Sequence, residues 1–309
     1  MSEIKEIELI KEEKPLEPQK RLSPTSINSW HKCPRQYYHN YIQKLKTKPS
    51  IDLLKGSIIH KVLEDFYRGF KPDMKEHMLG LFEKAWESNK QNIKDLELPL
   101  DKEIQSKDDC VTILLQYLTS IQRKIEMYKA MGKAEDDSHG FYLLKPKFRE
   151  IFVEDKDLHV CGYIDRVHTD FDGNVTLGDY KTSNKFGIGL PMDYKRQLSL
   201  YSLLYASQEK KVPDFAAVIF LRFGEEYILE VTPTLLKYAR DTATYTYERT
   251  RSIDIVDYPK QESNLCRWCS FYDMCSGGAE YEKKVRENRL KEIIEKNKKE
   301  VQNVESSGN

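Results

Sequence analysis

Two acidic side chains and a lysine are spaced so that they could share a metal ion. The segment GDYKT contains Asp179 and Lys181, and the segment GYIDRV contains Asp165. Side chains alternate along a strand, so Asp179 and Lys181 share one face while Tyr180 points to the other. Two neighbouring carboxylates repel each other unless a cation neutralises them, and Mg²⁺ or Mn²⁺ prefers oxygen ligands. Such an ion could activate water against a phosphodiester, with Lys181 orienting that water or stabilising the developing negative charge.

A β-hairpin is the element that would bring the acids together. Asp172 and Gly173 separate two runs of alternating bulky side chains, which is a strong hairpin signal. Asp165 and Asp179, 14 residues apart (179 − 165), would then lie side by side. An isolated D-x-K triplet more often marks a surface salt bridge on an exposed strand, so other features must decide.

Helical periodicity dominates the first half of the chain. It predicts a helix capped by Ser23 or Thr25 that continues through HKCPRQYYHNYI, and three more amphipathic helices before about residue 133. The later pattern predicts an α/β core sheet with a helical layer. Strands are expected in FYLLKPKFREIFVE, LHVCGYIDRVHTD, VTLGDYKT, FAAVIFLRF and EYILEVT, with a helix over DYKRQLSLYSLLYASQ between the third and the fourth, and helices over TPTLLKYARDTATYTYERTR and EYEKKVRENRLKEIIEKNKKE after the fifth.

Four cysteines have the residue type and spacing of a metal centre. Cys266, Cys269 and Cys275 form a C-x2-C-x5-C motif, and Cys33 is the candidate fourth ligand. Four thiolates could hold zinc or an iron–sulfur cluster, and residue types alone do not choose between them. The remaining cysteines are expected to be buried as small apolar side chains; they are Cys110 and Cys161.

The composition limits the classes of partner. The 50 Lys and Arg residues balance 50 Asp and Glu residues, so any path for DNA must be local. The start of the chain lacks the apolar core of a secretory signal, and no stretch of about 18 apolar residues exists to span a membrane. We therefore expect a cytoplasmic protein without membrane contact. No G-x4-G-K-[ST] loop occurs, which indicates that a separate helicase or repair protein would supply any motor.

Four motifs together with the cysteines resemble a known family. GSIIH at 56–60, GYIDRV, GDYKT and QLSLY at 197–201 are similar to the successive motifs of RecB- and AddB-type nucleases in the PD-(D/E)xK superfamily. The resemblance implies a restriction-endonuclease-like α/β core, with a mixed central sheet flanked by helices, an N-terminal and central helical region and a C-terminal iron–sulfur segment. It divides the chain into a disordered tail over 1–20, a nuclease domain over 21–276 and a charged helix with its tail over 277–309, with a helical insertion at about 71–133 and the iron–sulfur segment at 264–276.

The resemblance also assigns roles to individual residues. It makes Lys181 the catalytic lysine, and it implies that Gln197 and Tyr201, four residues apart on one helix face, contact DNA or order the site. Glu150 resembles a carboxylate of some relatives. The implied ligands of the Mg²⁺ or Mn²⁺ ion are His60, Asp165, Asp179 and the backbone carbonyl of Tyr180.

The cysteine arrangement resembles the structural 4Fe-4S site of AddB-type nucleases and of CRISPR-associated adaptation exonucleases, with zinc as the alternative. The implied function is a metal-dependent DNA exonuclease that acts on single strands or DNA ends in repair or recombination. Two alternatives stay open, a CRISPR adaptation nuclease that trims DNA before integration and a non-catalytic nucleic-acid-binding module. A local DNA path is suggested by the tyrosines before QKLKTK, whose rings could stack on bases; they are Tyr37, Tyr38 and Tyr41.

Overall fold

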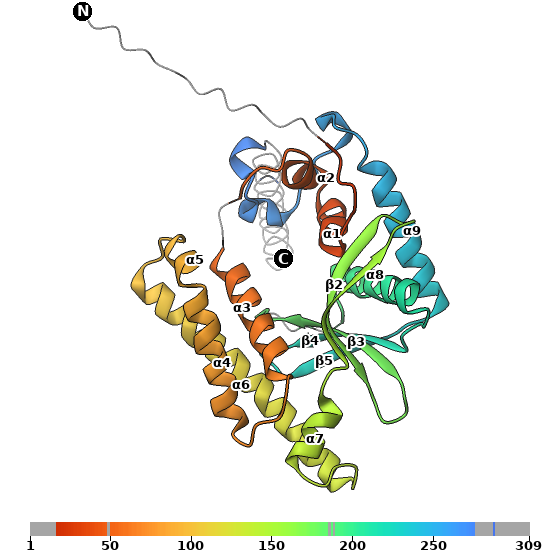
Figure 1. Cartoon of the computed structure of the whole chain (residues 1–309). Coiled ribbons are helices and arrows are strands. Elements are labelled where there is room, and N and C mark those ends of the chain that lie inside the picture. The colour runs from red at the N-terminus through yellow and green to blue at the C-terminus, as the bar shows by residue number, and fades with distance from the viewer. Residues whose placement is uncertain (1–16, 48–49, 185–186, 188, 276–286, 288–309) are drawn as a thin grey trace, which may run out of the picture. The chain divides into compact units, whose positions relative to one another are not determined.

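The computed structural model consists of two compact units (Figure 1). The described residues between 21 and 28 and between 47 and 248 form the larger unit, and residues 17–20, 29–46 and 249–275 belong to the smaller. The charged helix expected after residue 280 lies outside the described residues. Among the helices that the structure describes, none is both long and apolar enough to cross a lipid bilayer. The described residues are 17–47, 50–184, 187, 189–275 and 287.

A five-stranded mixed sheet forms the centre of the larger unit, as the sequence predicted. The strands lie in the order β1-β2-β3-β4-β5, and only the pair β3 and β4 is parallel. The turn between β2 and β3 contains Gly173 at φ +83°, a conformation that glycine adopts without steric cost. The strands are β1 (Phe148–Asp155), β2 (Val160–Thr169), β3 (Val175–Lys181), β4 (Phe215–Phe220) and β5 (Glu225–Glu230).

Helices cover the sheet and bury its apolar side chains. Tyr180 of β3 and Ile219 of β4 belong to one core cluster with side chains of α3, α4, α6 and α7. Helix α8 connects the parallel strands β3 and β4, a crossover that a short turn cannot make, and it packs against β1 and β4. The helices are α3 (Ile51–Phe66), α4 (Met74–Ser88), α5 (Lys90–Lys94), α6 (Leu100–Ala130), α7 (Asp137–Leu144), α8 (Met192–Glu209) and α9 (Pro233–Arg249).

The segment FYLL is helical, so the strand predicted to include it begins later, at Phe148. Asp136 caps this helix by accepting a hydrogen bond from the backbone N–H of His139 at 2.8 Å. Phe141 and Leu144 face the core from it. Pro146 then ends the helix, because the residue before a proline avoids helical backbone angles. A short apolar run next to a strand therefore carried too little periodicity to distinguish helix from strand.

The long helix predicted from Ser23 through residue 42 is broken at Cys33. Ser23 caps it as expected, with its Oγ accepting from the N–H of Ser26 at 3.1 Å. Cys33 has extended backbone angles (φ −164°, ψ 109°) because Pro34 follows it. The break replaces one helix by three segments, namely α1 (Pro24–Lys32), α2 (Pro34–Tyr37) and a π-helix, η1 (Tyr38–Ile42).

Aromatic packing forms the core of the smaller unit. Trp30 meets Tyr258 edge to face at 5.6 Å between ring centroids, and Tyr37 lies parallel to Tyr258 at 6.1 Å. Tyr37 is 0% and Tyr38 4% exposed, so their rings stack within the protein. Stacking on nucleic-acid bases is therefore wrong for these two rings. For Tyr41, which is only partly buried, the suggestion stays a prediction. Three 3-10 segments complete the unit, namely η2 (Ile255–Asp257), η3 (Asn264–Trp268) and η4 (Tyr272–Met274).

Candidate active site and cysteine pocket

The hairpin of β2 and β3 places Asp165 beside Asp179. Arg166 pairs with Gly178 across the two strands, so the preceding and following residues are the two acids. Asp165 is 9% and Asp179 3% exposed. The carboxylate of Asp165 also accepts a hydrogen bond at 2.6 Å from the backbone N–H of Tyr180, which fixes its orientation.

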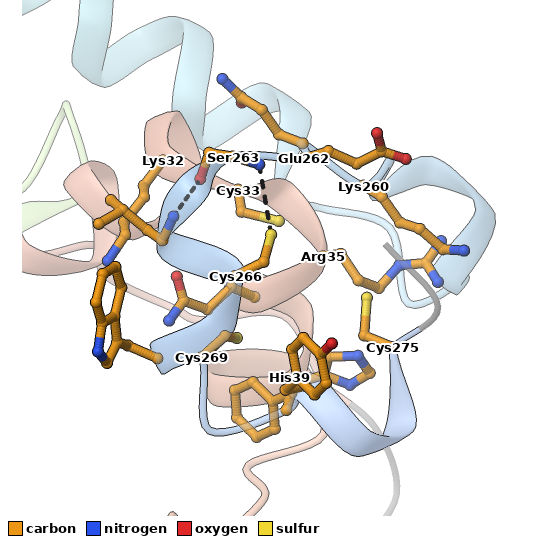
Figure 2. A pocket seen from close by; sticks show the side chains of 16 residues that line it. Lys32, Cys33, Arg35, His39, Lys260, Glu262, Ser263, Cys266, Cys269 and Cys275 are labelled. Carbon is orange, nitrogen blue, oxygen red and sulfur yellow. Dashed lines mark hydrogen bonds between the residues drawn. The ribbon is translucent and has the colours of Figure 1, made fainter. Parts of the chain in front are cut away.

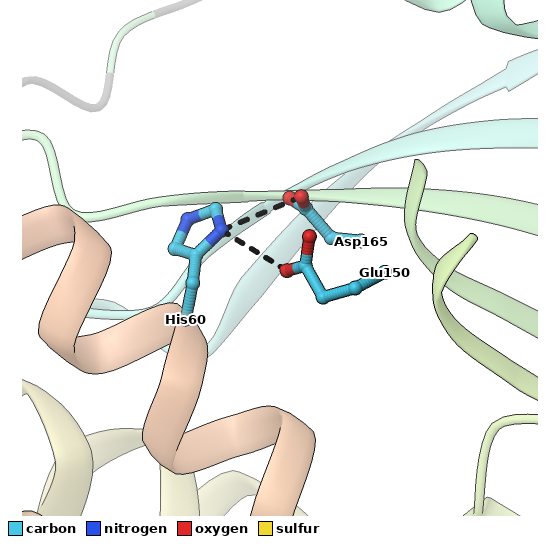
Figure 3. A group of neighbouring side chains, drawn as sticks. All are labelled: His60, Glu150 and Asp165. Carbon is cyan, nitrogen blue, oxygen red and sulfur yellow. Dashed lines mark ion pairs between the residues drawn. The ribbon is translucent and has the colours of Figure 1, made fainter. Parts of the chain in front are cut away.

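His60 projects from α3 towards two carboxylates (Figure 3). Its Nδ1 atom lies 3.4 Å from Asp165 Oδ1 and 3.6 Å from Glu150 Oε1. Burial lowers the pKa of His60, but hydrogen bonds to Asp165 and Glu150 and the negative charge of Asp179 outweigh it and raise the pKa to about 10. A metal ion would therefore have to displace a proton from this imidazole.

Glu150 was not among the ligands implied by the resemblance, and the structure brings it into the site. Within the described residues, one group of histidine, cysteine or acidic side chains has three ligand atoms within 4.8 Å of one another, and it consists of His60, Glu150 and Asp165. Glu150 has φ +48°, which is uncommon for a residue with a side chain. The pairs on either side, Arg149 with Arg166 and Ile151 with Ile164, set Glu150 opposite Asp165. This register could have been counted from the hairpin sequence, whereas the backbone angle could not.

Lys181 and Gln197 hold the second acid, Asp179. Lys181 Nζ lies 2.6 Å from Asp179 Oδ2, and Gln197 Nε2 donates to Asp179 Oδ1 at 3.0 Å. Gln197 also contacts the hydroxyl of Tyr201 at 3.1 Å, one turn along α8. Gln197 is 9% and Tyr201 8% exposed, so both side chains are buried beside Asp179.

The charges of these groups fit a cation. Three carboxylates, at Glu150, Asp165 and Asp179, are compensated by the ammonium of Lys181 and the protonated imidazole of His60. Burial raises the pKa of Asp179 to about 6, while the Lys181 charge opposes the rise, so the carboxylate is ionised at neutral pH. Replacing the imidazole proton by a divalent ion would improve the charge balance, and the hard oxygen donors suit Mg²⁺ or Mn²⁺.

Arg166, beside Asp165 on β2, is part of the core. It is 8% exposed, donates to the carbonyl of Leu144 at 3.4 Å and lies 3.9 Å from Glu226. It therefore pairs with a partly buried acid and is not available to a phosphate.

The four predicted cysteines line one pocket in the smaller unit (Figure 2). The cavity has a volume of about 100 Å³, which is room for several water molecules. No three of the four sulfur atoms, all in described residues, lie within 4.8 Å of one another. Burial raises the pKa of the Cys269 thiol, and the other three cysteines contribute to the rise. The ligand candidates are Cys33, Cys266, Cys269 and Cys275.

Backbone N–H groups point at two of these sulfur atoms. Ser263 N donates to Cys266 Sγ at 3.4 Å, and the backbone of Phe271 bonds to Cys269. Such bonds stabilise thiolates that ligate a metal. Of the two cysteines expected in the core, Cys110 is 0% exposed and Cys161 is only partly buried, beside Arg21 and Glu154.

One comparison with known proteins identifies the family of this chain. A structure from Eubacterium rectale, of a protein provisionally named an exonuclease, is 13% identical; the match covers 81% of this chain and 87% of that chain, with a TM-score of 0.48. A comparison with curated proteins gave no match. The family model of the PD-(D/E)XK nuclease superfamily matches residues 21–276. Because this match spans most of the sequence, and the hairpin acids and lysine fall within it, the chain belongs to the PD-(D/E)XK nuclease superfamily.

Proposed function

We propose that this protein is a metal-dependent deoxyribonuclease of the RecB or AddB type that removes nucleotides from single strands or DNA ends during repair or recombination. One observation carries the proposal: His60, Glu150 and Asp165 converge within 4.8 Å beside the buried pair of Asp179 and Lys181. A surface salt bridge, the alternative for the D-x-K triplet, does not fit, because Asp179 is 3% exposed.

The residues present would divide the work of phosphodiester hydrolysis. A Mg²⁺ or Mn²⁺ ion, held by His60, Asp165, Asp179 and Glu150, would polarise the phosphate and lower the pKa of a bound water. The ammonium of Lys181, kept protonated by its contact with Asp179, is placed to stabilise negative charge that develops on the phosphate. Gln197 keeps Asp179 from rotating, so the acids need little rearrangement during the reaction.

Digestion of end-labelled oligonucleotides tests this function. The purified protein should shorten single-stranded and double-stranded DNA with Mg²⁺ or Mn²⁺ and leave it intact with EDTA. The order in which labelled fragments appear distinguishes removal from an end from internal cleavage. Lys181→Met should lose the activity while the protein still folds, with a lower unfolding midpoint because the buried Asp179 carboxylate loses its partner. A wild-type protein that binds DNA but never cleaves it would instead support the non-catalytic module.

We also propose that the cysteine pocket holds a structural 4Fe-4S cluster. Four sulfur atoms around a single zinc, each about 2.3 Å from it, would be roughly 3.8 Å apart. The cavity of about 100 Å³ that the four cysteines line has room for a cluster with several metal atoms, which supports this proposal. Anaerobically purified protein should be brown, with broad absorption near about 400 nm and iron in the sample. Colourless protein with one equivalent of zinc would contradict this assignment.

A further inference from the structure

Two large aromatic side chains are exposed together on the β1–β2 hairpin. Phe152 on β1 and Tyr163 on β2 face each other in register. Phe152 is 40% and Tyr163 57% exposed, and their ring centroids are 5.2 Å apart with an angle of 57° between the planes. A cross-strand aromatic pair stabilises a hairpin, and the exposed faces of these two rings also form a small apolar surface that a flat ligand could contact.

The hairpin does not need this surface for its own core. The neighbouring residues Val153 and Ile164, which point to the opposite face, are both 0% exposed. That face packs against helix α8. The aromatic pair is therefore on the side of the hairpin that α8 leaves open to solvent.

The aromatic pair is close to the metal site. Tyr163 precedes Asp165 by two residues, and Phe152 follows Glu150 by two. The Cα atoms of residues two apart on an extended strand, such as Tyr163 and Asp165, lie roughly 7 Å from each other, which is about the reach of one nucleotide. The next position along this face holds Glu154, whose carboxylate is 2.7 Å from the half-exposed guanidinium of Arg21.

We propose that Phe152 and Tyr163 stack on a nucleobase of a single-stranded DNA whose adjoining phosphate enters the metal site. The inference rests on the proposed nuclease function and specifies that the site accepts single-stranded rather than duplex DNA. A base in a duplex is already stacked on both sides and paired, so its face is not available to these rings. An unpaired base offers its flat surface whatever its sequence, and aromatic side chains bind such bases without sequence preference.

We call the ring pair of Phe152 and Tyr163 the aromatic platform. Binding of a fluorescently labelled oligothymidylate to the full chain tests whether this platform contacts DNA bases. Ca²⁺ replaces Mg²⁺ in the assay so that the strand is not cut. Phe152→Ala and Tyr163→Ala should each weaken binding about five- to a hundredfold. Tyr163→Phe and Tyr163→Trp keep a ring and should bind nearly as the wild type does, the latter with quenched fluorescence on binding. Tyr142→Ala is the matched control, since Tyr142 is 52% exposed on α7.

Removing the base provides the complementary test. An oligonucleotide with abasic positions should bind the wild type more weakly than oligothymidylate does, while Tyr163→Ala should not distinguish the two. In cleavage assays with Mg²⁺ or Mn²⁺, Tyr163→Ala should raise KM for single strands by the same factor and leave kcat within about twofold, because the metal site is unchanged.

The other outcomes overturn either the aromatic platform or the nuclease function, and they can be told apart. Equal binding by the wild type and both alanine variants would show that the rings do not contact bases. Cleavage of duplexes together with no affinity for single strands would reject the platform and leave the nuclease function standing. Absence of cleavage with intact, ring-dependent binding of single strands would reject the nuclease function and leave the platform.

Discussion

The metal site and the cysteine pocket are built on different principles. In the metal site, opposite charges already touch, as Lys181 and Asp179 do at 2.6 Å, and the side chains come from strands and helices anchored in one large core. In the cysteine pocket, the sulfur atoms come from the break after α1 and from short 3-10 segments, and no three of the four are within 4.8 Å. Carboxylates and cations hold one another in position without an added ion, whereas thiols attract one another weakly. We infer that the first site is preorganised by the fold and that the second stabilises the fold through what it binds.

The largest expected effect comes from removing one charge from the metal site, which should abolish most of the activity and leave the stability nearly unchanged. Asp165→Asn should lower the cleavage rate at least about a thousandfold, because a carboxylate next to the reacting phosphate is lost. The thermal unfolding midpoint should hardly change, since the amide oxygen can still accept from Tyr180 N–H. Cleavage assays and thermal unfolding measure the two effects.

Asp155, a buried acid at the end of β1 in the β1–β2 hairpin, provides the control for a loss of stability without a loss of activity. Asp155 accepts from the N–H groups of Asp157 and Leu158 and from Ser207 Oγ, outside the metal site. Asp155→Ala, which removes the acceptor of all three bonds, should lower the unfolding midpoint and leave the cleavage rate of the folded protein intact. If Asp165→Asn unfolded the protein as well, the site would not be preorganised.

The cysteine pocket should show the reverse pattern. Cys266→Ser should lose the bound metal and about 2 to 4 kcal/mol of stability, as is typical when a structural metal is removed. Metal analysis and thermal unfolding of the full chain check this. Cys161→Ser, which alters a partly buried thiol outside the pocket, should change neither quantity. A Cys266→Ser protein with the same unfolding midpoint as the wild type would contradict a structural role.

Replacing Gln197 should have an intermediate effect on metal affinity, because this residue acts only by orienting Asp179. Gln197→Leu removes the hydrogen bond that orients Asp179, and such supporting contacts change metal affinity by about 10- to 100-fold. Titration with Mn²⁺ should show the loss, and activity should return at high metal concentration. Tyr201→Phe removes only the hydroxyl that contacts Gln197 and should have the smaller effect. Loss of activity that no Mn²⁺ concentration restores would argue for a direct role of Gln197.

Mild acid should weaken the larger unit through His168 on β2. Burial, together with the charge of Arg166, lowers the pKa of this imidazole from 6.5 to about 4. The folded protein resists the proton that the unfolded chain accepts, so stability is complete above about pH 6.5 and falls as the pH drops towards 4. The loss is about 2 kcal/mol, allowing for partial solvent exposure. Urea unfolding of the wild type and His168→Gln at pH 7 and pH 5 should show the larger loss in the wild type.

Much of both sites followed from the sequence. The Asp-Gly turn and the alternation around it predicted the pairing that sets Asp165 beside Asp179, and the cysteine spacing predicted the set that lines one pocket. These features depend on local geometry, which a sequence pattern records. The left-handed backbone of Glu150 and the burial of Tyr37 and Tyr38 depend on contacts between distant segments, which the pattern does not contain. The aromatic pair on the hairpin was missed for that reason, because alternation does not say which face a helix covers.

The backbone of Glu150 has a consequence for the history of this hairpin. A side chain at φ +48° costs free energy that glycine would not incur. Random substitution followed by selection for thermal stability alone should therefore enrich Glu150→Gly. The same variant would remove a carboxylate from beside His60. In a lineage that is no longer selected for cleavage, Glu150→Gly would raise the stability of the protein and remove a candidate metal ligand. A glycine at this position in a relative would therefore indicate that the relative has lost catalytic activity.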